Sequence, residues 1–195
     1  MLEDFSLHFK QGGTYAIIGA SGSGKSMLAR ALIGRSKVCD GNISIGGTDV
    51  REIPLTELYK NVLYIPQNTF LFEGTVLENI SFFGDDVTAK KSGLQASLPK
   101  HLLSAEAGGD RGQSLSGGEK TRLSVARALS SPASVLIFDE PTSGLDPETV
   151  SEIEQLILSI EGKTIFVITH NWDKEYLSKF DEVIKVSAEE RILNI

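Results

Sequence analysis

Short hydrophobic runs recur along the chain, and segments with helical spacing separate them. Four of these runs predict buried strands: 15–18, 62–65, 135–138 and 165–168. The run from Val135 to Phe138 has no polar residue, as expected of a strand that is covered on both faces. Because strands and helices alternate in this way, the pattern predicts an α/β fold with a mostly parallel sheet.

Helices are predicted where hydrophobic residues recur every three or four positions. Asp146 is a favourable N-cap for one of them, and Pro147 fits its first turn. Ser116 and Glu119 can cap another helix by forming a Ser-x-x-Glu capping box. The predicted helices cover about 27–32, 55–60, 116–129, 146–160 and 173–180.

Residues 84–113 differ in composition from the rest of the chain, because charged residues and glycines are frequent and the hydrophobic periodicity is weak. Helices are expected there at about 88–97 and 99–107. A capping box formed by Thr75 and Glu78 begins a short helix just before them. We interpret this part of the chain as a small helical lobe inserted in the main domain.

The length of the chain is enough for one domain with a small lobe. The core is expected to consist of about 1–66 and 114–195, and the inserted helical subdomain of about 67–113. Further short strands are expected at about 5–9, 42–47 (ending in a tight turn), 183–186 and 191–194.

One segment fits the pattern Gly-x-x-x-x-Gly-Lys-Ser/Thr, namely Gly19-Ala20-Ser21-Gly22-Ser23-Gly24-Lys25-Ser26. It lies between an expected strand and an expected helix, which is the context of a phosphate-binding loop. Glycines let backbone N–H groups point at an anion, and the helix start adds partial positive charge. Lys25 can reach the β- and γ-phosphates, and the Ser26 hydroxyl can bind Mg²⁺.

Polar residues follow the other three apolar strands, and the ligands of parallel sheets bind beyond the carboxyl ends of the strands. After the third strand, Asp139 can bind Mg²⁺ and Glu140 can act as a general base, or the pair is a solvated loop. Gln67 can bind Mg²⁺ or water, or is a polar loop residue. His170 can contact the γ-phosphate, or is an exposed loop histidine. Together with the phosphate loop, they predict one nucleotide site.

Two glycines, Gly117 and Gly118, directly follow the capping residue Ser116. The capping box explains the start of this helix without any ligand, but glycine weakens the first turn of a helix. Bare glycine amides at a helix start suit an anion that approaches closely. Asp146, in contrast, is explained by its role as an N-cap alone.

The 195 residues include 41% hydrophobic residues, and 19 basic against 26 acidic side chains give a net charge of -7. This balance does not favour nucleic acid as a direct partner. Cys39 is the one cysteine, which excludes an internal disulfide and fits a reducing compartment. We recognise no signal peptide and no hydrophobic run of membrane-spanning length, so a soluble cytoplasmic chain is expected.

These segments together resemble the nucleotide-binding domain of an ATP-binding cassette (ABC) transporter, over nearly all 195 residues. The phosphate loop matches Walker A, 136–140 match Walker B with the catalytic glutamate, and Gln67 matches the Q-loop. Residues 115–119, Leu-Ser-Gly-Gly-Glu, match the family signature LSGGQ, the most specific of these motifs. Residues 143–146 match the D-loop, and His170 matches the switch histidine.

The resemblance implies a P-loop NTPase core with an inserted helical subdomain and a small N-terminal antiparallel β part, which is truncated here. It also implies hydrolysis of ATP with Mg²⁺. The residues from Gly19 to Met27 would bind ATP, and Ser26, Gln67 and Asp139 would hold the metal. Lys25, Glu140 and His170 would act in catalysis.

Partners follow from the same resemblance. In the family two such domains pair head to tail, so a second nucleotide-binding domain, most simply a second copy, is expected. Ser116, Gly117 and Gly118 would then contact the γ-phosphate bound by the partner, and Asp146 would communicate across the interface. Transmembrane domains would hold the pair at the cytoplasmic face of a membrane and use it to power transport.

Residues 70–80 are similar to the stretch after the Q-loop in exporter-type members of the family. Phe70 and Phe72 would help form a groove for a helix of the transmembrane part, or would anchor the small lobe to the core. The sequence leaves two other functions open. One is a soluble ABC ATPase that acts on ribosomes or DNA, and the other is a truncated cassette that binds ATP but barely hydrolyses it.

Three features depart from the family pattern. The aromatic residue that usually stacks on adenine would lie upstream of residue 1, so either a longer parent chain supplies it or adenine is held weakly. The interval from Gln67 to Ser116 is short, so a trimmed helical lobe is expected. Glu119 replaces the usual Gln, and Met27 replaces the usual Thr and would contribute its backbone amide.

Overall fold

The structure is a computed structural model that describes residues 6–35, 41–82, 85–108, 115–187 and 192–194. Phe5, Cys39 and the domain boundary expected at 113–114 therefore lie outside the described residues. Contacts divide the chain into two compact units. The first unit comprises Met1–Tyr64, Ala133–Glu140 and Glu161–Ile195, and the second comprises Ile65–Pro132 and Pro141–Ile160.

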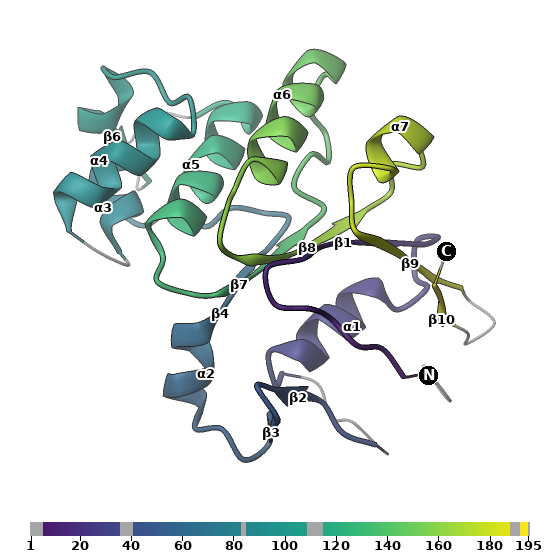
Figure 1. Cartoon of the computed structure of the whole chain (residues 1–195). Helices are drawn as coiled ribbons and strands as arrows, with labels where there is room; N and C mark the ends of the chain where they lie inside the picture. Colours follow the sequence, from purple (N-terminus) through teal and green to yellow (C-terminus); the bar gives the residue numbers. More distant parts are fainter. Residues whose placement is uncertain (1–5, 36–40, 83–84, 109–114, 188–191, 195) are drawn as a thin grey trace. The chain divides into compact units, whose positions relative to one another are not determined.

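A six-stranded sheet organises the first unit, with the strand order β10-β9-β1-β8-β7-β4 (Figure 1). Its strands are β1 (Thr14–Ile18), β4 (Val62–Ile65), β7 (Val135–Asp139), β8 (Thr164–Thr169), β9 (Glu182–Val186) and β10 (Ile192–Asn194). β1 pairs in parallel with β8 and β9, and β7 pairs in parallel with β8, whereas β10 is antiparallel to β9. The predicted α/β fold with a mostly parallel sheet is confirmed.

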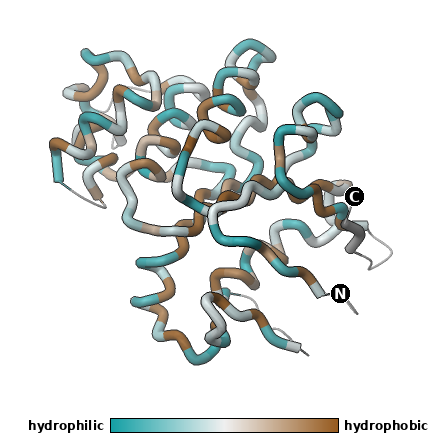
Figure 2. The backbone as a smooth tube through the Cα atoms, in the orientation of Figure 1, coloured by the Kyte–Doolittle hydropathy of each residue, from teal (hydrophilic) through white to brown (hydrophobic). Residues whose placement is uncertain are grey.

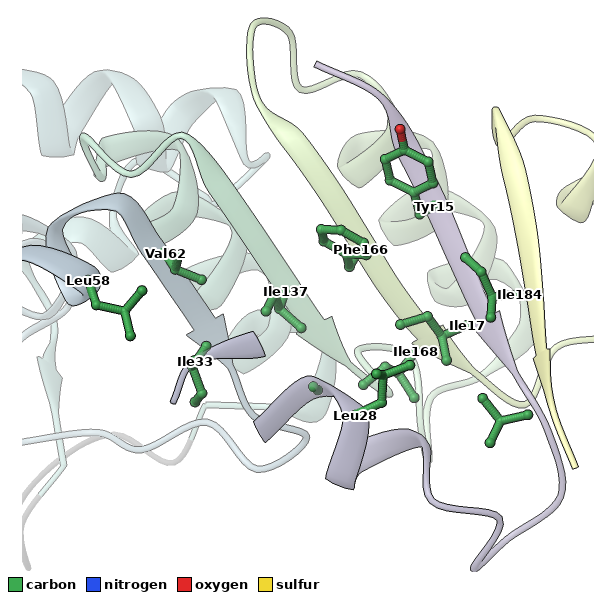
Figure 3. Packing of buried hydrophobic residues seen from close by; sticks show 12 residues of the cluster. Tyr15, Ile17, Leu28, Ile33, Leu58, Val62, Ile137, Phe166, Ile168 and Ile184 are labelled. Carbon is green, nitrogen blue, oxygen red and sulfur yellow. The ribbon is translucent and has the colours of Figure 1, made fainter. Parts of the chain in front are cut away.

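Hydrophobic residues from the sheet and from two helices form the core of the first unit. The helices are α1 (Lys25–Leu32) and α2 (Leu55–Asn61). Leu28 of α1 packs in one cluster with Ile17 of β1 and Ile168 of β8 (Figure 3). Every residue of β8 is buried, as expected of a central strand that is covered on both faces.

A tight hairpin of β2 (Ser44–Ile45) and β3 (Thr48–Asp49) agrees with the strand and turn predicted over 42–47. Gly46 and Gly47 form its turn with positive φ values of 58° and 83°. A turn with two positive φ values matches the twist of the flanking strands, and glycine adopts it without strain.

The strand expected at 5–9 is absent from residues 6–10, which have no regular secondary structure. The alternating pattern was correct about burial, because Leu7 and Phe9 pack against the core cluster. The Phe9 ring lies 4.8 Å from the rings of both Tyr15 and Phe166. Alternate side chains of this segment are therefore partly buried through packing and without strand pairing.

The prediction of a helix at 99–107 is also wrong. A short 3-10 helix, η1 (Leu102–Ser104), is followed by β6 (Glu106–Ala107), which pairs with β5 (Gly74–Thr75). Pairing with a distant strand thus overrides a weak local helical preference. The helix expected at 173–180 is shortened to α7 (Lys174–Leu177). The backbone N–H groups of Lys179 and Phe180 donate hydrogen bonds to carbonyls three residues earlier, and these tighter turns lead the chain towards β9.

Four helices dominate the second unit: α3 (Val76–Ser81), α4 (Asp86–Gln95), α5 (Gly117–Ser130) and α6 (Pro147–Leu158). The predicted capping boxes are present at Thr75 and Ser116. Hydrophobic and hydrophilic residues alternate along these helices (Figure 2), and α6 buries one side with Ile153, Glu154 and Ile157. The described residues of 67–113 all fall within this unit, together with α5 and α6, while the predicted subdomain boundaries stay a prediction.

Arg127 of α5 joins this helix to α3 and to the segment before it. Its guanidinium donates to Asn79 O at 2.7 Å, to Asn79 Oδ1 at 2.8 Å and to Phe70 O at 2.7 Å. Asn79 is fully buried and in turn exchanges hydrogen bonds with the backbone of Phe72. Burial lowers the pKa of Arg127 to about 10, so it stays protonated at neutral pH.

Arg127→Met is expected to destabilise the protein by about 2 kcal/mol, because buried carbonyl acceptors would lose their donors. Urea unfolding followed by circular dichroism measures this loss. Arg122→Met on the same helix is the matched control, since Arg122 forms an ion pair with the half-exposed Glu152. The control should cost less than about 1 kcal/mol. Equal losses in the two variants would contradict the role of Arg127.

Candidate functional site

The phosphate loop leaves β1 at Gly19 and enters α1 at Lys25. Gly22 and Gly24 have φ values of 78° and 101°, which favour glycine at both positions. A Cβ atom at Gly19 would lie 2.3 Å from Val186 O and 2.6 Å from Ser23 Oγ, so no side chain fits there. The glycines of the predicted motif are therefore needed for the path of the loop itself.

Lys25 is buried inside this loop. Its Nζ donates to Gly19 O at 2.9 Å and to Ala20 O at 3.0 Å, which uses two of the three ammonium hydrogens. Burial lowers the pKa of Lys25, and the nearby carboxylates of Glu140 and Asp139 act in the opposite direction. A buried cation of this kind gains from an anion placed beside it.

The side chain of Ser23 indicates whether the loop is suited to bind a phosphate group. Its Oγ is buried and has no hydrogen-bond partner among the described residues. Buried hydroxyls in folded proteins are nearly always hydrogen-bonded, so an unpaired one at this position points to a ligand. A phosphate oxygen would accept its hydrogen bond, and the loop therefore fits the group that its sequence motif predicts.

Asp139 lies at the end of β7 and contacts two hydroxyl groups. Ser26 Oγ is 3.4 Å from Asp139 Oδ1, and Tyr64 OH is 2.5 Å from Asp139 Oδ2. Burial and the hydrogen bond to Asp139 raise the pKa of Tyr64 to about 12, so this hydroxyl stays protonated and donates. A serine hydroxyl and one carboxylate fit Mg²⁺, which keeps several waters and also takes phosphate oxygens.

Glu140 has an unusual backbone conformation, with a φ value of 49°. Its N–H donates to Ile168 O at 2.9 Å, and its Oε1 lies 2.6 Å from His170 Nε2. A residue other than glycine at positive φ costs on the order of 1–3 kcal/mol, and such residues cluster at functional sites. The structure thus brings Glu140 and His170 into direct contact, at the same edge of the sheet as Asp139.

In the second unit, Gln67 Nε2 donates to Ser143 Oγ at 3.0 Å. The two signature glycines lie against the segment that follows Ser143. A Cβ atom at Gly117 would be 2.9 Å from Leu145 Cδ2, and one at Gly118 would be 3.0 Å from Thr149 Cγ2. The structure therefore supplies a packing reason for these glycines that the sequence did not reveal.

Asp146 caps α6 by accepting a hydrogen bond from Thr149 N at 3.0 Å. Hydrogen bonding from Thr149 lowers the pKa of this carboxylate. Ser116 forms the cap of α5 with Glu119, and both Ser116 and Gly117 are exposed. Ser116 and Gly117, at the start of α5, thus lie on the surface of the second unit.

A protein-family model described as "ABC transporter" matches residues 2–143. The chain belongs to the ABC transporter family. It carries the ATPase domain of that family, as the sequence motifs predicted.

Several ABC proteins are similar to this chain. The Lactococcin-G-processing and transport ATP-binding protein LagD of Lactococcus lactis subsp. lactis is 35% identical over 182 residues, which cover 88% of this chain and 26% of that protein. The ATP-dependent lipid A-core flippase of Vibrio cholerae is 34% identical over 201 residues, covering 98% and 34%. The chain thus spans about a quarter to a third of the length of these relatives. Their transport functions do not favour a ribosome- or DNA-associated ABC ATPase.

Two solved ABC structures share the fold. A bacterial Atm1-family ABC exporter with ATP bound has a TM-score of 0.79 and 29% identity, over 91% of this chain and 33% of that one. A dimeric, post-hydrolysis ATP-binding cassette bound to ADP and Pi has a TM-score of 0.82 and 26% identity, over 98% of this chain and 89% of that one.

The sequence-predicted residues of the ABC site fall into two groups. Lys25, Ser26, Asp139, Glu140 and His170 lie together in the first unit, whereas Gln67, Ser116, Gly117, Gly118 and Asp146 belong to the second. The sequence pattern does not single out Tyr64, because this residue lies within the apolar run 62–65. A single hydroxyl in that run, three residues before Gln67, was the available signal.

Proposed function

We propose that this ABC domain binds and hydrolyses ATP and so powers transport across a membrane. The observation that carries the proposal is the convergence of five side chains at the phosphate-loop end of the sheet. Lys25 and Ser26 come from the loop and α1, Asp139 and Glu140 from the end of β7, and His170 from the end of β8. Ligands of parallel sheets bind at this end.

Each of these residues has a chemical role in the proposal. The loop amides and Lys25 hold the β- and γ-phosphates, and Ser26 and Asp139 would hold Mg²⁺. When bound, Mg²⁺ neutralises charge on the phosphate oxygens. Glu140 accepts a proton from the attacking water, and the contact with His170 keeps its carboxylate oriented.

The signature helix gives the proposed site a second half on another copy of the domain. Ser116 and Gly117 are exposed at the start of α5, where backbone N–H groups can donate to an anion. One structural relative is a dimeric ATP-binding cassette bound to ADP and Pi. In the proposed head-to-tail dimer, these residues contact the γ-phosphate of the partner's nucleotide, and Asp146 lies at the interface.

Transmembrane domains are the second proposed partner, which would place this domain at the cytoplasmic face of a membrane. Among the described residues, none of the helices has the length and hydrophobicity needed to cross a bilayer. Phe70 is 73% exposed and available for docking. Phe72 is half-buried and contacts Phe82 and Arg127, so of the two interpretations it supports anchoring within its own unit.

The ATPase rate is expected to rise more than linearly with protein concentration, because each active site needs two copies. Initial rates of phosphate release over a range of protein concentrations measure this dependence. A rate strictly proportional to concentration from the lowest concentration upwards would contradict a shared site.

Mixing two inactive variants tests the head-to-tail arrangement directly. Lys25→Ala removes the phosphate lysine but keeps the signature, and Ser116→Arg blocks the signature but keeps the lysine. A mixed dimer has one intact site, so combining the two variants should restore part of the activity. Absence of any rescue from a mixture that forms dimers would exclude a site shared in this way.

A further inference from the structure

Tyr64 has no part in the mechanism proposed above, yet its hydroxyl forms a direct hydrogen bond with the Asp139 carboxylate. The oxygen-to-oxygen distance is 2.5 Å, and because a carboxylate only accepts hydrogen bonds, Tyr64 donates. Ser26 Oγ lies 3.4 Å from the other oxygen of the same carboxylate. The two oxygens of Asp139 therefore have different neighbours: Oδ2 faces the tyrosine, and Oδ1 faces the serine.

The tyrosine is held more firmly than an isolated surface residue would be. Its backbone belongs to β4 in the six-stranded sheet, and its ring packs against the hydrophobic core cluster that includes Val62 and Ile137. A tyrosine side chain has only two rotatable angles, so a packed ring fixes the position of its hydroxyl. The hydrogen bond thus fixes the rotation of the Asp139 carboxylate.

Water does not readily replace this bond. Asp139 is 7% exposed, so the carboxylate depends on the protein for most of its hydrogen-bond donors. Without the tyrosine hydroxyl, Oδ2 would lose its donor and the carboxylate would be free to turn. Oδ1 would then no longer be held beside Ser26.

We propose that Tyr64 is a positioning residue that holds Oδ2 of Asp139 so that Oδ1 stays turned towards Ser26 for Mg²⁺ binding. This inference rests on the proposed function, because Asp139 Oδ1 and Ser26 Oγ become metal ligands only in a nucleotide site. Hydrogen bonds to ligating carboxylates orient them, and the loss of such a partner typically lowers metal affinity by about 10–100-fold.

Tyr64→Phe removes the hydroxyl and keeps the ring. Mn²⁺ serves as the probe, since electron paramagnetic resonance counts the free ion in the presence of the protein and a non-hydrolysable ATP analogue. The variant is expected to bind Mn²⁺ about tenfold more weakly than the wild type. Calorimetry in EDTA should show unchanged affinity for the analogue, because the phosphate loop is intact.

Tyr59→Phe is the matched control. The Tyr59 hydroxyl accepts a hydrogen bond from Arg35 Nε at 3.2 Å on the surface of the first unit. This variant should match the wild type in both measurements. Thermal denaturation without nucleotide checks that both variants fold.

Testing Tyr64→Phe in an Asp139→Asn variant distinguishes a role in positioning the Asp139 carboxylate from a general loss of packing. In Asp139→Asn the carboxylate is gone, so adding Tyr64→Phe should cause no further loss of Mn²⁺ affinity. A further tenfold loss in that background would show that Tyr64 acts elsewhere and would overturn the inference.

Two other results distinguish this inference from the proposed function. Wild-type Mn²⁺ affinity in Tyr64→Phe, with normal nucleotide binding, would overturn the positioning role alone. An equal loss of affinity for the ATP analogue with and without Mn²⁺ in Tyr64→Phe would also overturn the positioning role, because the defect would then lie in the fold of the phosphate loop. A wild-type protein that binds no ATP analogue would overturn the proposed function and this inference together.

Discussion

Glu140→Gln is expected to lower the ATP hydrolysis rate by about a thousandfold while leaving ATP affinity unchanged, because a general base is removed without a change of shape. Glutamine keeps the size of the side chain but cannot take a proton from water. The backbone at φ 49° is compatible with either residue to the same degree, so the loop should keep its path. Steady-state phosphate release and calorimetry measure the two quantities.

The same variant should accumulate as an ATP-bound dimer, because binding closes the pair and hydrolysis no longer opens it. Size-exclusion chromatography with ATP and Mg²⁺ detects this species. Glu161→Gln is the control, since Glu161 is an exposed residue of the first unit, and it should hydrolyse ATP normally. Wild-type turnover in Glu140→Gln would exclude Glu140 as the base.

Lys25→Ala is expected to weaken ATP binding by about a hundredfold, since hydrogen bonds between charged groups contribute about 1.5–3 kcal/mol and 1.4 kcal/mol is a factor of ten. The buried ammonium is already placed within the loop by its bonds to Gly19 O and Ala20 O. Its removal takes away the cation that would face the β- and γ-phosphates.

Calorimetry with ATP and Mg²⁺ measures the affinity, and the melting temperature without nucleotide reports on the fold. Lys179→Ala removes an exposed lysine of the same unit and should leave ATP affinity unaffected. If Lys25→Ala bound ATP as tightly as the wild type, the phosphate loop would not be the nucleotide site.

Local sequence patterns predicted the central elements of this ABC domain well. The four buried strands and the helices beginning near Lys25, Ser116 and Asp146 appear close to their expected bounds. Each was marked by a strong local signal, such as a continuous apolar run, a capping box or a glycine motif. Signals of this kind act through the backbone of neighbouring residues, so they do not require the rest of the fold.

The secondary-structure predictions were wrong where contacts with distant residues determine the local structure. Residues 106–107 pair with β5 and do not continue a helix, and Phe9 reaches its neighbours by ring packing without strand pairing. In both places the local pattern was weak or short. A contact made elsewhere in the chain was therefore enough to change the outcome.

The sequence by itself determined the phosphate loop, the order of the motifs and the end of the sheet where Asp139, Glu140 and His170 are found. Only the tertiary structure decided that Tyr64 holds Asp139, that Glu140 bonds to His170, and that the signature glycines pack against 145–149. These contacts join residues that are 75, 30 and about 30 positions apart. Side chains so distant in the chain leave no periodic pattern, because their contact depends on how the strands and helices pack.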